Sequence, residues 1–212
     1  TLSPSSAASD VYKRQSRTLQ ALGVARSHEA VRQWVHRLAG RARNLILDEK
    51  ADTAIVDETA VNVASRQVWL WIAIEPEHRA VLAVMLTETR NIFAAHSLFT
   101  SSRHRGVKRV ITDGASWYRL AARWTRLRHS VVREGVRSYV ERFIETIKDR
   151  LRSFDCYFPS PKKLLDSALR LLYAWAYFYN YAGFHLSFGK PPRPLPGANE
   201  LERLKAIAVR GD

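Results

Sequence analysis

Short apolar runs divide the middle of the chain into segments that resemble β-strands. The first three are rich in β-branched and aliphatic residues, and they cover residues 54–56, 68–74 and 80–86. Two shorter runs follow at residues 109–112 and 128–132. Runs of this length and composition are typical of strands buried in a sheet. The pattern therefore predicts five strands, with hairpin loops joining the first three.

Apolar residues recur at helical spacing between and after these strands. They predict helices at residues 91–100, 116–124, 140–154 and 161–181. Three hairpin strands are thus followed by a helix, a strand, a helix, a strand and further helices. This order resembles that of a ribonuclease H-like domain. It predicts an α/β fold: a mixed five-stranded sheet with helices on both faces.

Two more helices are predicted ahead of the sheet. Residues 17–22 form a short one, residues 23–27 a turn with Ser27 as N-cap, and residues 28–38 a basic second helix. This arrangement matches the last two helices of a helix-turn-helix, although an ordinary helical hairpin fits the spacing equally well. No candidate for the usual first helix precedes them, so we expect a small helical helix-turn-helix remnant.

Composition divides the chain further. The serine- and alanine-rich residues 1–15 lack periodicity, and we expect them to be disordered and foreign to the fold. The helix-turn-helix remnant would then cover residues 16–40, a charged linker 41–52, and the ribonuclease H-like domain 53–188. Residues 189–212 are expected to form an extended tail, because four prolines lie between positions 189 and 197.

The charge of the chain points to a polyanionic partner. It has 34 Lys and Arg against 20 Asp and Glu, a net charge of +14, which favours nucleic acid or an anionic membrane surface. Residues 1–15 hold no secretory signal, and Asp166 and Arg170 interrupt the longest apolar run. We therefore expect a soluble protein that binds nucleic acid in the cytoplasm, on the nucleoid. A lone cysteine excludes a disulfide framework and a cysteine-only zinc site.

Three acids occupy positions suited to metal binding. Asp57 follows the first predicted strand, Asp113 follows the fourth, and Glu141 opens a helix. One such acid alone is better explained as part of a charged turn, but the pattern occurs twice. In a ribonuclease H-like sheet the first and fourth strands are neighbours. Asp57 and Asp113 are therefore expected to meet at the carboxyl ends of these strands, although 55 residues separate them in sequence. Carboxylate oxygens are the ligands that Mg²⁺ prefers.

The residues around these acids carry a family resemblance. The motifs Val-Asp-Glu-Thr (56–59), Thr-Asp-Gly-Ala-Ser-Trp-Tyr (112–118) and Val-Glu-Arg-Phe (140–143) resemble the catalytic motifs of DDE insertion-sequence transposases. The match is to the cointegrate-forming class, which is related to retroviral integrases. Lys148 stands seven residues after Glu141, as in that family, and Tyr-Asn-Tyr (179–181) with His185 resembles its "YN…H" ending. At positions 137–138, Arg-Ser stands where the family often has asparagine.

The resemblance implies an activity and a set of partners. Asp57, Asp113 and Glu141 would be the catalytic residues and would hold two Mg²⁺ or Mn²⁺ ions for DNA 3′-end cleavage and strand transfer. The DNA partners would be terminal inverted repeats and target DNA, bound by a homodimer or higher oligomer. The DNA-binding residues would be Lys148, Arg152, Arg32 and Arg37. The alternatives are an inactive remnant that still occupies element ends, and a nuclease for RNA–DNA hybrids, which leaves the amino-terminal helices unexplained.

Several neighbouring residues have simpler interpretations. Glu58 is expected to lie in a solvated turn, and Trp117 and Tyr118 in the core. Lys148 and Arg152 fit either a phosphate contact or a solvated helix face that pairs with its own glutamates. Glu141 and Glu145 are one turn apart on one helix, and the motif favours Glu141 as the third ligand.

Overall fold

A computed structural model of the chain describes residues 13, 16–47, 50–63, 66–132, 138–150, 164–183, 185 and 189–193. Most of residues 1–15, the predicted contact Arg152 and the lone Cys156 lie outside these residues. The same holds for the predicted extended tail, apart from residues 189–193.

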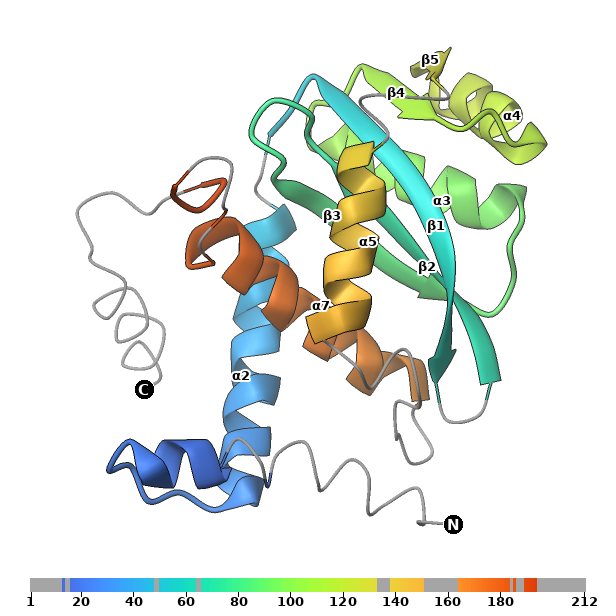
Figure 1. Ribbon diagram of the computed structural model, residues 1–212. Helices are drawn as coiled ribbons and strands as arrows, with labels where there is room; N and C mark the ends of the chain where they lie inside the picture. Colours follow the sequence, from blue (N-terminus) through green and yellow to red (C-terminus); the bar gives the residue numbers. More distant parts are fainter. Residues whose placement is uncertain are drawn as a thin grey trace.

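A mixed five-stranded sheet forms the centre of the fold (Figure 1). Its spatial order is β3-β2-β1-β4-β5. The pairs β1–β2 and β2–β3 are antiparallel, whereas β1–β4 and β4–β5 are parallel. The predicted sheet is therefore confirmed, including the first strand beside the fourth. The strands are β1 (Thr53–Val63), β2 (Arg66–Ile74), β3 (Val81–Thr87), β4 (Arg109–Thr112) and β5 (Arg128–Val131).

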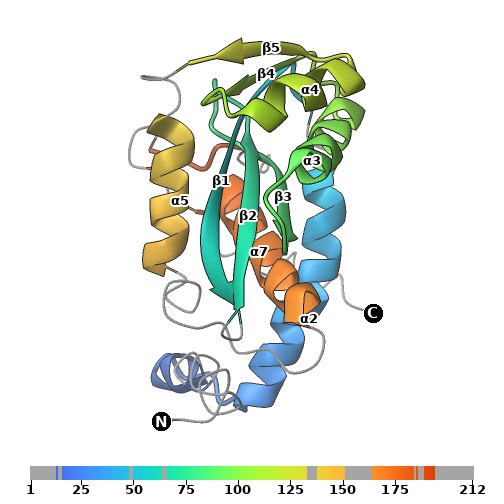
Figure 2. The same ribbon diagram turned by 90° about the vertical axis from the view of Figure 1, so that its right-hand side faces the viewer.

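Helices cover both faces of the sheet (Figures 1 and 2). Side chains alternate between faces along a strand, so β1 contributes to two cores. Ala54 and Val56 pack with α3 (Ile92–His104) and α4 (Ser116–Thr125). Ile55 packs on the opposite face, which α2 (His28–Leu47), α5 (Ser138–Arg150) and α7 (Leu164–Tyr181) cover. Within the described residues, no helix is long and apolar enough to cross a membrane.

Two elements extend well beyond the ends that the sequence predicted. The first strand was expected at residues 54–56, but β1 has 11 residues, because its pairing with β2 continues through the acids to Val63. The second amino-terminal helix was expected to end at residue 38, but α2 continues to Leu47. Its extension buries Ala42 and Ile46 in the core that α7 shares. Residues 41–47, expected as linker, are therefore helical.

The amino-terminal helical pair is present as predicted. Residues 16–21 are helical, a turn follows, and α2 begins at His28. Ser27 caps α2: its Oγ accepts a hydrogen bond from the backbone N of Ala30 at 3.2 Å. The second half of α2 packs against the sheet domain, since Ala42 and Ile46 are completely buried there. The pair is thus anchored to the body of the protein through one continuous helix.

The asparagine of the Tyr-Asn-Tyr motif joins α7 to the edge of the sheet. Asn180 is fully buried. Its Oδ1 accepts a hydrogen bond from the backbone N of Val81 at 2.8 Å, and its Nδ2 donates to the Val81 carbonyl at 2.9 Å. One side-chain amide thereby satisfies both backbone groups of the first residue of β3. The role of this motif residue is structural.

Replacing Asn180 with alanine is expected to lower the free energy of unfolding by about 2–4 kcal/mol, because two hydrogen bonds are lost and two buried backbone groups are left unpaired. Urea unfolding followed by circular dichroism measures this change. The control is Asn62→Ala, at an exposed position of β1, which is expected to change stability by less than about 0.5 kcal/mol. Equal effects of the two substitutions would contradict this role for Asn180.

Candidate active site

Asp57 and Asp113 are brought together by the parallel pairing of β1 with β4. That pairing joins Thr53–Ile55 to Arg109–Ile111 in constant register. Asp57 lies two residues beyond the last pair on β1, and Asp113 lies two residues beyond it on β4. Continuing the register sets the two aspartates opposite each other. The prediction that Asp57 ends its strand is wrong, since β1 continues past it, but Asp57 does lie where the pairing with β4 has ended.

Strand alternation directs Asp57 to one face of the sheet. It shares the phase of Ile55 and Val61, whose side chains lie in the core beneath α5 and α7. Asp57 is 7% exposed, and its Oδ1 accepts a hydrogen bond from the backbone N of Glu58 at 3.0 Å. The backbone of the next residue thus holds this carboxylate. Asp57 therefore lies on the face of the sheet that also carries the helix of Glu141.

A tight turn fixes Asp113 directly after β4. The Asp113 Oδ1 accepts a hydrogen bond from the backbone N of Ala115 at 3.0 Å. Gly114 has a φ of 89°, which residues with a side chain rarely adopt. A Cβ at this position would also lie 2.7 Å from Cγ1 of Val131 on the neighbouring strand. The glycine of this motif is therefore required by both backbone conformation and space.

The third acid comes from α5. Val140, Phe143 and Ile144 are buried against the sheet, whereas Glu141 and Glu145 are exposed. Figure 1 shows α5 lying over β1, with its first turn toward β4. Glu141 belongs to that first turn. Glu141 therefore lies in the turn of α5 that is nearest to β4, and Glu145 lies one turn further along the helix.

The donor chemistry of these acids fits divalent cations. Three carboxylates offer the hard oxygen ligands of Mg²⁺ and Mn²⁺. In the described part of the chain, one group of three His, Cys, Asp or Glu residues has ligand atoms all within 4.8 Å of one another, and it lies elsewhere. The three acids therefore do not form such a compact group here.

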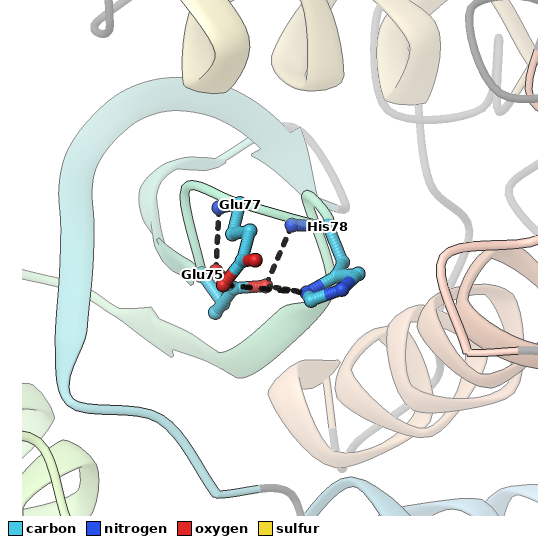
Figure 3. Close-up of side chains that lie close together, drawn as sticks. All are labelled: Glu75, Glu77 and His78. Carbon is cyan, nitrogen blue, oxygen red and sulfur yellow. Dashed lines mark hydrogen bonds and ion pairs between the residues drawn. The ribbon is translucent and has the colours of Figure 1, made fainter.

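The compact group is formed by Glu75, Glu77 and His78 in the turn between β2 and β3 (Figure 3). The Glu75 carboxylate accepts hydrogen bonds from the backbone N of Glu77 at 2.5 Å and of His78 at 2.8 Å. It also lies 3.2 Å from the His78 Nδ1 and 3.4 Å from Nη2 of Arg193. Its oxygens therefore accept the hydrogen bonds that close the turn and form an ion pair with Arg193. We assign this group a structural role.

Glu58 is buried on the opposite face from Asp57. Its side chain is 0% exposed, so the expectation of a solvated turn is wrong. Its Oε1 accepts a hydrogen bond from Nε of Arg90 at 2.7 Å and forms an ion pair with Nη2 at 2.6 Å, and its Oε2 accepts a hydrogen bond from the Tyr118 hydroxyl. The physical reason is the length of β1, which carries the residue into the sheet instead of into a loop.

The charges of Asp57 and Asp113 contribute to the pKa of the Glu58 carboxyl group. Burial raises the pKa of Glu58 to about 7, the Arg90 guanidinium opposes this rise, and the charges of Asp57 and Asp113 add to it. The two aspartate charges thus place negative potential in this part of the sheet, which favours the binding of a cation.

The pattern of apolar residues along the sequence did not indicate a role for Arg90. It stands in the short connection between β3 and α3, and its guanidinium lies 4.6 Å from the ring centroids of both Trp69 and Trp117. The two tryptophans are far apart in sequence and belong to different elements, β2 and α4. Only the tertiary structure brings both of them to one arginine. Tyr118 lies in the core, as predicted, and Trp117 is partly buried against that core.

The predicted DNA contacts fall in two regions. Lys148 is half-buried on α5, the helix that carries Glu141. Arg32 and Arg37 are exposed in the first turns of α2, which extend away from the sheet (Figure 1). Arg32 holds Glu29 with hydrogen bonds of 2.8 and 2.5 Å, which lower the pKa of Glu29 to about 2.

Comparison with known proteins identifies the family. Residues 51–155 match the DDE domain of IS240-type transposases. The uncharacterised protein MJ0017 of Methanocaldococcus jannaschii is 29% identical over 165 residues, which cover 73% of this chain and 72% of that protein. Residues 51–155 therefore form a DDE transposase domain of the IS240 family.

The solved structure of an integrase catalytic core shares the fold. The HTLV-2 integrase catalytic core, in complex with magnesium, superimposes with a TM-score of 0.50 at 18% identity, covering 68% of this chain and 95% of that core. The BIV integrase core gives a TM-score of 0.48 at 14% identity, over 76% of this chain and 99% of that core. The first comparison supports the ribonuclease H-like, integrase-core fold.

Gly114→Ala is expected to lower the free energy of unfolding by about 1–3 kcal/mol, because alanine is strained at positive φ and its Cβ meets Val131. The matched control is Gly40→Ala in the interior of α2, where a Cβ meets nothing within 4 Å. That substitution is expected to raise stability by about 0.5–1 kcal/mol. Chemical unfolding of both variants tests the difference in sign, and a Gly114→Ala variant as stable as wild type would contradict it.

Proposed function

We propose that this DDE transposase cuts the 3′ ends of an insertion sequence and joins them to target DNA in a reaction that depends on Mg²⁺. The observation that carries the proposal is the register of β1 and β4. Continuing this register by two residues would set Asp57 opposite Asp113, and Asp57 has the phase of the sheet face that the helix of Glu141 covers. The match of residues 51–155 to a DDE domain supports the same assignment.

Asp57, Asp113 and Glu141 would hold the two Mg²⁺ or Mn²⁺ ions. Ions so held activate a water or hydroxyl for attack on a phosphate and stabilise the leaving oxygen. The protein contributes fixed geometry: the backbone N of Glu58 orients Asp57, and the turn through Gly114 orients Asp113. Glu141 adds a carboxylate from a separate element. The site thus combines two rigid ligands from the sheet with one from a helix.

Lys148 and the amino-terminal helices would hold the DNA. Lys148 lies seven residues after Glu141, about 10 Å further along α5, where a phosphate of a bound strand can reach it. Arg152 would be a further phosphate contact. Arg32 and Arg37 would contact the terminal inverted repeat, with Arg32 exchanging Glu29 for a phosphate. A homodimer or higher oligomer would bring two element ends together on the nucleoid, in the cytoplasm.

Metal dependence is tested with strand cleavage on duplex DNA that carries the element's own ends. Asp57→Asn and Asp113→Asn are expected to reduce Mg²⁺-dependent cleavage by about a thousandfold or more, because bound metal supplies several kcal/mol of transition-state stabilisation. DNA affinity is expected to persist, since it depends on basic residues. The matched control is Asp52→Asn, an exposed aspartate just before β1 that pairs with Lys108. Cleavage in excess chelator, or equal loss in the control, would refute the proposal.

The choice of third ligand is tested by two variants of α5. Glu141→Gln is expected to be inactive, whereas Glu145→Gln keeps substantial cleavage, because one helical turn moves Glu145 about 6 Å further along the axis. Both residues are exposed, so neither substitution is expected to disturb the fold. The reverse pattern of activities would assign the ligand to Glu145.

The amino-terminal helices are tested by the salt dependence of DNA binding. Replacing Arg32 and Arg37 together with alanine is expected to flatten the slope of log K against log salt by up to about two. Glu29→Gln provides a matched control with the opposite effect on DNA affinity. It releases Arg32 from its ion pair and is therefore expected to strengthen DNA binding. If the double variant keeps both the wild-type slope and the preference for element ends, α2 does not contact DNA.

A further inference from the structure

Glu58 follows Asp57 directly but extends to the other face of the sheet. Asp57 has the phase of Ile55, whereas Glu58 has the phase of Ala54 and Val56, in the core beneath α3 and α4. The Glu58 side chain is completely buried. Its backbone N nevertheless donates to the Asp57 carboxylate. Any movement of Glu58 therefore also moves a group that orients Asp57.

The Glu58 carboxylate reaches the segment that carries Asp113. Its Oε2 accepts the hydrogen bond of the Tyr118 hydroxyl, and Tyr118 lies in α4, which begins at Ser116, three residues after Asp113. One carboxylate thus connects the residue next to Asp57 with the helix that follows Asp113. These two segments are otherwise joined by the β1–β4 ladder, which has ended before either aspartate.

The Tyr118 hydroxyl is held in a fixed position. The Tyr118 ring is fully buried, stacks on Phe99 with centroids 5.7 Å apart, and meets Trp71 edge-on at 6.2 Å. Trp71 is the direct partner of Glu58 in the β1–β2 ladder. The ring is therefore confined from two sides, and its hydroxyl position is set by packing.

Arg90 fixes the other carboxylate oxygen. Its Nε donates to Oε1 of Glu58, and its Nη2 forms an ion pair with the same oxygen. Its guanidinium contacts the rings of both Trp69 on β2 and Trp117 on α4, 4.6 Å from each centroid. Cation–π contacts of this kind favour a planar guanidinium over a lysine ammonium. The arginine is therefore held in place from outside the ion pair, and α4 is bound to the network a second time.

Stability alone does not account for this arrangement. Replacing a buried ion pair with well-packed apolar side chains is often neutral or stabilising. Hydrogen bonds differ from apolar contacts in specifying direction and distance. A buried carboxylate bound from two segments is suited to fixing how those segments lie relative to each other.

We propose that Glu58 is a positioning residue, which together with Tyr118 and Arg90 sets the placement of Asp57 relative to Asp113 for binding divalent cations. The network acts from the face of the sheet opposite the acids, and it touches neither metal nor DNA. The inference rests on the proposed function, because it assumes that the two aspartates share bound cations.

Tyr118→Phe tests the inference, because it removes one hydroxyl and leaves every charge near the site unchanged. The matched control is Tyr173→Phe on α7, which also loses one hydroxyl, bonded to the Val84 carbonyl at 3.3 Å. The readout is the Mn²⁺ dissociation constant of the full chain without DNA, from the electron paramagnetic resonance signal of free Mn²⁺. Circular dichroism establishes that both variants are folded at the temperature used.

Tyr118→Phe is expected to raise the Mn²⁺ dissociation constant about tenfold or more, as for partners that orient metal ligands elsewhere. Tyr173→Phe is expected to leave it at the wild-type value, and affinity for duplex DNA in chelator is expected to be the same for both. In a second series, Glu58→Gln retains an acceptor for Tyr118 and is expected to bind Mn²⁺ better than Glu58→Ala.

The possible failures are distinguishable. Equal Mn²⁺ constants for Tyr118→Phe and Tyr173→Phe would overturn the positioning role. The proposed function would still stand if Asp57→Asn abolishes Mn²⁺ binding. A wild-type chain that binds no Mn²⁺ at these acids would overturn the proposed function and the positioning role together.

Discussion

The three residue pairs that join the start of β1 to β4 determine where Asp57 and Asp113 lie. The pairs run from Thr53–Arg109 to Ile55–Ile111, and they join segments that are more than 50 residues apart in sequence. Parallel strands keep a constant register, so the aspartates that follow on each strand come to lie opposite each other. The turn through Gly114 and the start of α4 are placed by the same pairing. A shift of one residue in β1 would send Asp57 to the wrong face.

The alternation of β1 gives its two adjacent acids different environments. Asp57 lies on the face covered by α5, the helix whose first turn carries Glu141. Glu58 is enclosed on the other face by Arg90 and Tyr118. Burial of a carboxylate is costly unless it is paired and hydrogen-bonded, and here both conditions are met. A single strand therefore carries a candidate metal ligand and the buried network that we propose to position it.

Sequence patterns predicted the element order, the mixed sheet and the adjacency of the first and fourth strands, because strand and helix periodicities are local. They placed Asp113 correctly after its strand. They ended β1 at Asp57, since acids usually interrupt a strand, and so they also put Glu58 in a solvated turn. The ladder with β2, which continues to Val63, depends on contacts between distant segments. The contacts of Arg90 with the rings of Trp69 and Trp117 likewise depend on the tertiary structure and could not be predicted from the sequence.

The central claim is that Asp57 and Asp113 share divalent cations with Glu141. Anomalous diffraction from crystals of the protein grown or soaked with Mn²⁺ tests it most directly, because it locates the ions without reference to activity. The account predicts anomalous density between the two aspartates, with the Glu141 carboxylate nearer to it than that of Glu145. Density confined to other acids, such as Glu75 and Glu77 in the β2–β3 turn, would contradict it.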